Sequence, residues 1–142
     1  MKDKVFLDTN VFVYTQSSIE TRKRAISINV IEQEACYVST QILNEISNVM
    51  TKKMKMRTNE VKQIVAAVNA KCIVSLVDYN TVQRALDLKE RYGYSYYDCL
   101  VLASALESGC QKIYTEDMSD GQVIEKTLQI VNIFHPTQKE DE

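Results

Sequence analysis

Four acidic residues lie where the pattern of apolar residues predicts partly buried structure. Each follows or interrupts an apolar run, and they are Asp8, Glu45, Asp98 and Asp117. A buried carboxylate is costly unless it is paired or bound to a metal, and neighbouring carboxylates raise one another's pKa. No basic residue is matched to these acids in their motifs. A divalent cation, which takes oxygen ligands, would offset their repulsion.

Each acid also has a purely structural interpretation. Asp8 can cap the segment that follows it, and Asp98 lies three residues after Ser95, as in a capping box. Glu45 can be an exposed residue of an amphipathic helix, and Asp117 can form a turn. The cation hypothesis therefore depends on the four side chains meeting in one place.

The remaining composition narrows the kind of metal. The only histidine is His135, so a zinc site built on several histidines is excluded. A Ser-His-Asp triad would have to recruit this residue, directly before Pro136. Four scattered cysteines form no C-x-x-C pair and are predicted to be small core residues in a reducing compartment. A metal held mainly by oxygen points to Mg²⁺ or Mn²⁺.

The elements that must position the acids follow from the hydrophobic pattern. Strands are predicted at residues 4–7, 36–40, 72–77, 112–115 and 128–134. Helices are predicted over residues 18–34, 41–53, 59–70, 79–92 and 96–108, with a short one over 122–126. In the first of these helices, Ala25, Ile28 and Ile31 recur at steps of three and predict its buried face.

Alternating strands and helices imply a three-layer α/β/α sandwich with a central, mostly parallel sheet. Ligands bind such sheets outside the carboxyl ends of the strands. Asp8, Asp98 and Asp117 are predicted near these ends or at the starts of the following helices, and Glu45 lies about one turn further along its helix. The acids are thus expected to converge on one edge.

The 142 residues fit a single domain, predicted over residues 1–135, with a polar tail at 136–142. The chain shows no apolar run of transmembrane length and no signal-peptide pattern, so the expected location is the cytoplasm. The net charge of −2 gives no global attraction for nucleic acid. One cationic stretch, "TKKMKMR", can still contact phosphates through Lys52, Lys53, Lys55 and Arg57, or it can be a solvated surface.

Four stretches of the sequence resemble the PIN-domain family, in particular VapC-type toxins of bacterial toxin–antitoxin pairs. They occur in the family's order over residues 4–117, and read "FLDTNVFVY", "ILNEISNV", "YSYYDCLVLASALESGC" and "IYTEDM". By this resemblance Asp8, Glu45 and Asp98 match the three core acids, and Asp117 matches a more variable fourth position. Asn10 and Thr115 match supporting polar positions. Glu116 and Asp120 lie close to Asp117 and remain alternatives for the fourth acid.

The resemblance implies an endoribonuclease that hydrolyses RNA phosphodiester bonds with Mg²⁺ or Mn²⁺, with the four acids as ligands and catalytic groups. It also implies an antitoxin partner that places a basic residue among the carboxylates. Tyr92, Tyr94, Tyr96 and Tyr97 precede Asp98 and can stack on bases, pack at the surface or form part of a homodimer face.

Three other classes compete with this interpretation. An inactive PIN scaffold could bind RNA or protein without cleaving, although such a scaffold is expected to have lost some of the acids. A haloacid dehalogenase-like phosphatase needs a second acid two residues after the first, where this chain has Asn10. A receiver domain would also need paired acids after the first strand.

Overall fold

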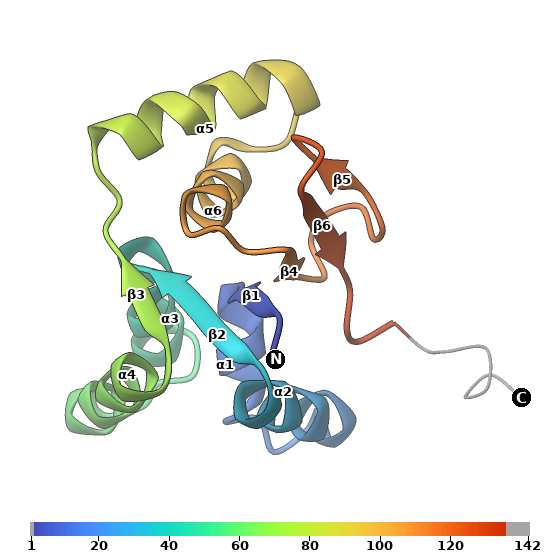
Figure 1. Ribbon diagram of the computed structural model, residues 1–142. Coiled ribbons are helices and arrows are strands. Elements are labelled where there is room, and N and C mark those ends of the chain that lie inside the picture. Colours follow the sequence, from blue (N-terminus) through green and yellow to red (C-terminus); the bar gives the residue numbers. More distant parts are fainter. Residues whose placement is uncertain (1, 136–142) are drawn as a thin grey trace, which may run out of the picture.

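The computed structural model describes residues 2–135 and contains one six-stranded sheet (Figure 1). The strands are β1 Lys4–Leu7, β2 Ala35–Ser39, β3 Ile73–Ser75, β4 Lys112–Tyr114, β5 Val123–Ile124 and β6 Leu128–Val131. Their order across the sheet is β3-β2-β1-β4-β6-β5. Every neighbouring pair is parallel except β5 with β6. The predicted mostly parallel sheet is confirmed.

Helices cover both faces of this sheet. They are α1 Thr9–Tyr14, α2 Thr21–Gln33, α3 Thr40–Lys52, α4 Thr58–Lys71, α5 Tyr79–Tyr92 and α6 Tyr96–Glu107. The chain moves outward from β1 through β2 to β3, then crosses back to β4. Because parallel crossovers are right-handed, α1 to α4 cover one face and α5 with α6 cover the other, as Figure 1 shows. The fold is the expected α/β/α sandwich.

Because helices lie on both faces of the sheet, the core contains the central strands and the helix packed against them. Val5, Phe6 and Leu7 of β1 are fully buried, because a central parallel strand has helices on both faces. Residues 99–105 of α6 are all buried as well. A helix that is apolar all round belongs inside a protein, and α6 lies between the sheet and α5. The four cysteines are free and buried, as predicted.

Three local predictions need correction. Helix α1 was not expected, because six residues are too few to show a helical period. No helix forms at 122–126, where β5 and β6 make a hairpin instead. The Ala25–Ile28–Ile31 face is wrong at two of its three positions. Ala25 is exposed and Ile28 is 37% exposed, and α2 buries Ser27 and Val30 instead, whereas Ile31 packs against the core. Steps of three drift around a helix that has about 3.6 residues per turn.

Three further observations complete the fold. The proposed tail at 136–142 lies outside the described residues. Along residues 2–135, none of the helices combines the length and apolar composition that a membrane crossing requires. Gly93 ends α5 in the left-handed conformation, with φ of 78°, as its place after the helix predicted.

The turn of the β5–β6 hairpin has an unusual sequence. Its two central residues, Glu125 and Lys126, have φ of 48° and 65°, a region that favours glycine or asparagine. Arg91 donates to the Glu125 carboxylate at 2.6 and 2.5 Å, and the Tyr92 hydroxyl accepts from the Glu125 amide at 2.9 Å. The end of α5 therefore holds the strained turn through Glu125, while Lys126 is exposed.

We expect Lys126→Gly to be more stable than Lys126→Ala by about 1 kcal/mol, because glycine, unlike alanine, adopts this backbone conformation without strain. Urea unfolding of both variants measures the difference, and the alanine variant controls for loss of the lysine side chain. Equal stability of the two variants would show that the turn is not strained.

Candidate functional site

Asp8 lies at the junction of β1 and α1. Its amide donates to the Tyr114 carbonyl at 3.1 Å, which continues the pairing of β1 with β4. Its side chain caps α1 by accepting from the Thr9 amide at 2.8 Å, so the structural interpretation of this residue is also correct. Its other carboxylate oxygen accepts from the Thr115 hydroxyl at 2.8 Å. Both bonds fix the carboxylate at the end of the central strand.

Burial dominates the electrostatics of Asp8, which is only 6% exposed. Burial raises its pKa to about 6, and the bonds from Thr115 and Thr9 oppose this shift. The charges of Glu45 and Asp117 raise the pKa further. The ionised form of Asp8 is therefore costly in the free protein.

Glu45 reaches the same place from α3. Ser39 caps this helix by accepting from the Ile42 amide at 3.4 Å. The half-buried Glu45 carboxylate accepts a short hydrogen bond from the Thr9 hydroxyl and a second one, of 3.2 Å, from the Gln41 side chain. Each carboxylate oxygen thus has one donor that restrains its orientation.

Asp98 and Asp117 complete the group from the other side. Asp98 lies in the first turn of α6, where its amide donates to the Ser95 hydroxyl at 3.2 Å. Burial raises the pKa of Asp98, a hydrogen bond with Ser95 opposes the shift, and the charge of Glu45 adds to it. Asp117 follows β4, and burial is again the first cause of its raised pKa, followed by the charges of Asp98, Glu116 and Glu45.

The four carboxylates line one open cavity of about 220 Å³. Its other lining residues are Thr9, Asn10, Asn48, Val49, Tyr97 and Val101. Within residues 2–135, none of the four acids forms an ion pair with a lysine or arginine. Side chains from four separate elements thus create a concentrated negative charge that the described part of the chain does not neutralise.

The neighbours of Asp117 are engaged elsewhere. Glu116 accepts from the Lys23 ammonium at 3.0 Å and from the Tyr14 hydroxyl. Asp120 accepts from the Asn132 amide at 2.8 Å. Of the three acids that compete for the fourth position, Asp117 is therefore the one that lines the cavity.

The donors suit a hard divalent cation, since all four are carboxylates. Within residues 2–135, however, no three His, Cys, Asp or Glu side chains are placed so that they could hold a metal ion together. Mg²⁺ keeps several waters and commonly takes only one or two protein carboxylates. The arrangement therefore fits a hydrated ion bound by few direct ligands better than a closed cage.

Of the remaining residues predicted from the sequence, some lie at the cavity and others lie away from it. Asn10 lines the cavity, and Thr115 lies behind Asp8. The four cations, by contrast, do not line it: Lys52, Lys53, Lys55 and Arg57 are exposed at and after the end of α3.

Two cavity residues were not singled out from the α3 sequence. Asn48 and Val49 lie three and four residues after Glu45, so the helical repeat of that face could have revealed them.

Solved structures with the same fold include several toxins. VapC20 of Mycobacterium tuberculosis, a toxin that cleaves the sarcin–ricin loop, is 16% identical with a TM-score of 0.65, covering 80% of this chain and 91% of that one. A toxin–antitoxin complex from Klebsiella pneumoniae is 16% identical with a TM-score of 0.69, covering 93% and 99%. VapBC2 from Rickettsia felis, bound to a fragment of its promoter DNA, is 12% identical with a TM-score of 0.64, covering 91% and 99%.

These low identities establish similarity of fold alone. No curated protein matches the sequence. The sequence itself matches the family model described as the PIN domain over residues 5–119, a segment that contains Asp8, Glu45, Asp98 and Asp117. The match covers most of the chain, and together with the fold it shows that this protein belongs to the PIN-domain family.

Proposed function

We propose that the protein is an endoribonuclease that hydrolyses RNA phosphodiester bonds with Mg²⁺ or Mn²⁺, and that it is the toxin of a type II toxin–antitoxin pair. One observation carries the proposal: four carboxylates from four elements line a single cavity and form no ion pair within residues 2–135. Family membership and the toxins among the structural neighbours support it.

Each acid has a distinct part in this proposal. Asp8, Asp98 and Asp117 would hold the hydrated cation, directly or through its bound waters, and Glu45 would be a further ligand or the group that orients the attacking water. When bound, the cation lowers the pKa of a water and stabilises charge on the phosphate oxygens. Thr115 keeps the Asp8 carboxylate in place, and Gln41 restrains Glu45. Asn10 and Tyr97 flank the acids at the cavity wall.

The partners follow from the charge of the cavity. We expect an antitoxin whose basic side chain enters among the carboxylates, because a cationic group would pair with acids that lack an ion pair in the described chain. Structures of toxin–antitoxin complexes among the neighbours favour such a partner. A homodimer and a cytoplasmic location complete the proposal, and the four free thiols agree with a reducing compartment.

Cleavage of a single-stranded RNA and of a structured RNA tests the activity. We expect products with 5′-phosphate ends in the presence of Mn²⁺, no cleavage with chelator, and a loss of at least about a hundredfold in Asp98→Asn, since a cavity ligand is removed. Thr127→Ala, at the distant hairpin, is the control for handling and folding. Cyclic phosphate ends would rule out this mechanism, and absence of any cleavage would indicate a binding scaffold.

Asp8→Asn should stabilise the free protein at neutral pH. The folded pKa of about 6 lies above the ordinary value of 3.8, so the Asp8 contribution to stability is lost as pH rises from about 4 to about 6. The free-energy difference between variant and wild type should therefore grow by up to about 3 kcal/mol over this range, measured by urea unfolding with chelator.

The same two proteins report on the cation. Mn²⁺ should raise the wild-type unfolding midpoint and leave that of Asp8→Asn little changed, because an ion that binds only the folded state stabilises it. A variant that is no more stable than wild type at pH 7 with chelator would contradict the costly ionisation of Asp8.

The exposed cations after α3 are the proposed contacts for RNA phosphates. In an Asp98→Asn background, which suppresses cleavage, Lys53→Glu should weaken RNA binding and lower the slope of log affinity against log salt by about 1. Lys126→Glu carries the same charge change on the β5–β6 turn and should leave the slope unchanged. Equal slopes in both variants would remove this stretch from the RNA path.

A further inference from the structure

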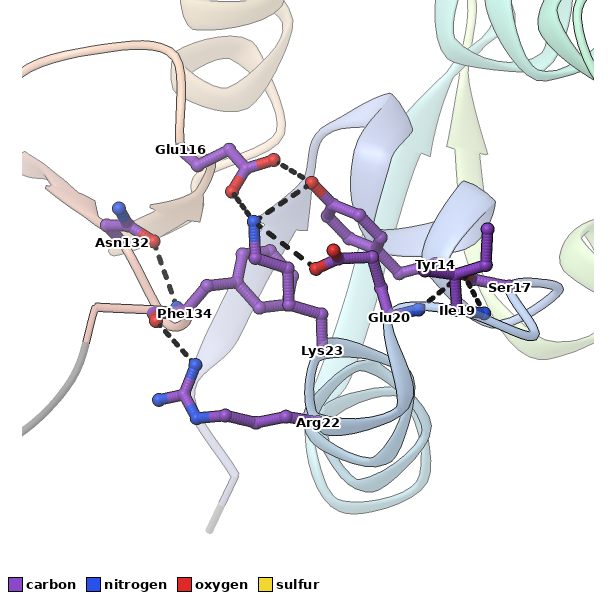
Figure 2. A network of polar contacts seen from close by, with 9 residues as sticks. All are labelled: Tyr14, Ser17, Ile19, Glu20, Arg22, Lys23, Glu116, Asn132 and Phe134. Atoms are coloured by element: carbon purple, nitrogen blue, oxygen red, sulfur yellow. Dashed lines mark hydrogen bonds and ion pairs between the residues drawn. The ribbon is translucent and has the colours of Figure 1, made fainter. Parts of the chain in front are cut away.

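The side chain of Lys23 connects α2 to the loop that carries Asp117 (Figure 2). Its ammonium donates to one Glu116 carboxylate oxygen at 3.0 Å and to the Tyr14 hydroxyl at 3.2 Å. The Tyr14 hydroxyl in turn donates to the other oxygen of Glu116. We call these three residues the Lys23 clasp. The Lys23 and Glu116 side chains are only 28% and 18% exposed, so water screens this pair less than it screens a surface ion pair.

Two aromatic rings, those of Tyr14 and Phe134, lie beside the Lys23 ammonium. The Lys23 ammonium lies 4.9 Å from the centre of the Tyr14 ring and 5.7 Å from that of Phe134. These rings meet edge to face, with centroids 5.0 Å apart. Phe134 is itself held, because its amide donates to the Asn132 side chain at 2.9 Å and its carbonyl accepts from Arg22 at 2.9 Å. The ammonium therefore has a fixed place above an ordered aromatic surface (Figure 2).

The clasp grips the loop at the residue between two site residues. On one side of Glu116, the Thr115 hydroxyl donates to Asp8 and accepts from the Asp117 amide at 3.1 Å. On the other side, Asp117 lines the acidic cavity. Helix α1 links both attachments, since Asp8 caps its start and Tyr14 is its last residue. The loop is thus held at two neighbouring residues, by the bond of Thr115 to Asp8 and by the bonds of Glu116 to Lys23 and Tyr14.

We propose that the Lys23 clasp is a positioning device that holds Asp117 at the cavity, so that Lys23 strengthens the binding of divalent cations although it is itself a cation. This inference rests on the proposed function. Lys23 is a positioning residue because it acts through Glu116 and does not line the cavity. By pairing with Glu116, it also offsets the charge of the carboxylate that precedes Asp117 in the chain.

The two possible effects of Lys23 have opposite signs, which makes the proposal testable. A lysine that acts only through its charge repels a cation from the nearby acids, so its removal would tighten metal binding. A lysine that positions Asp117 does the reverse, and its removal weakens metal binding. Supporting partners of metal ligands commonly change affinity by about 10–100-fold when they are lost.

The experiment measures the Mn²⁺ concentration that gives half of the maximal thermal stabilisation, without RNA. Lys23→Met should raise this concentration on the order of tenfold. Tyr14→Phe removes one hydroxyl without changing charge and should raise it by a smaller factor. Lys23→Arg, which can still pair with Glu116, should restore most of the affinity. Arg24→Met removes the same charge from the adjacent position of α2 and should leave the concentration near that of wild type.

The outcomes separate the clasp from the proposed function. A Mn²⁺ response in wild type with equal or tighter binding in Lys23→Met overturns the positioning role and leaves the metal site intact. Absence of any Mn²⁺ response in wild type overturns the metal site, and the clasp's role with it. If Lys23→Met does not fold, Tyr14→Phe decides, because unchanged affinity in that variant also overturns the proposal.

Discussion

The burial of several carboxylates in one cavity, to which their mutual repulsion adds, is the constraint on which the rest of the structure depends. Asp8 is nearly buried at the end of the central strand, where solvation no longer stabilises its charge. Hydrogen bonds from Thr9 and Thr115 compensate in part and prevent the side chain from turning away. Thr9 connects Asp8 to Glu45, because its amide donates to Asp8 and its hydroxyl donates to Glu45. The Thr115 hydroxyl connects Asp8 to the Asp117 amide. Asp8, Glu45 and Asp117 are thus linked through neutral groups, which hold them near each other without cancelling their charge.

The parallel sheet makes this gathering of acids possible. Strands β1 and β4 are neighbours that run in the same direction, so Asp8 and the loop after Tyr114 emerge at one edge. The helices supply the other two acids from opposite faces, Glu45 from α3 and Asp98 from α6 (Figure 1). Residues far apart in the sequence therefore meet because of strand order and crossover handedness, and no single local motif contains the site.

Most of this arrangement could be predicted from the sequence, but the turns and side-chain contacts between distant segments could not. Strand β1 and the caps at Ser39 and Ser95 were predictable because apolar runs and capping residues act locally. The hairpin at Glu125 was not, since its left-handed turn is stabilised by Arg91 and Tyr92 from a distant helix. For the same reason a partner for Glu116 could not be found, because α2 and the β4–β5 loop meet only after the chain has folded.

The burial of residues 99–105 of α6 has a consequence for how the site can change over evolutionary time. Asp98 lies in the first turn of a helix whose next seven residues are all buried. The packing of these residues in the core therefore fixes the position of the Asp98 carboxylate. Ala103 and Ala105 are fully buried, so a larger side chain at either position would displace α6 as a unit. Substitutions remote from the cavity can therefore alter its chemistry. Because α6 packs against β2, β4 and α5, we expect buried substitutions in α6 to be accompanied by compensating substitutions in those elements.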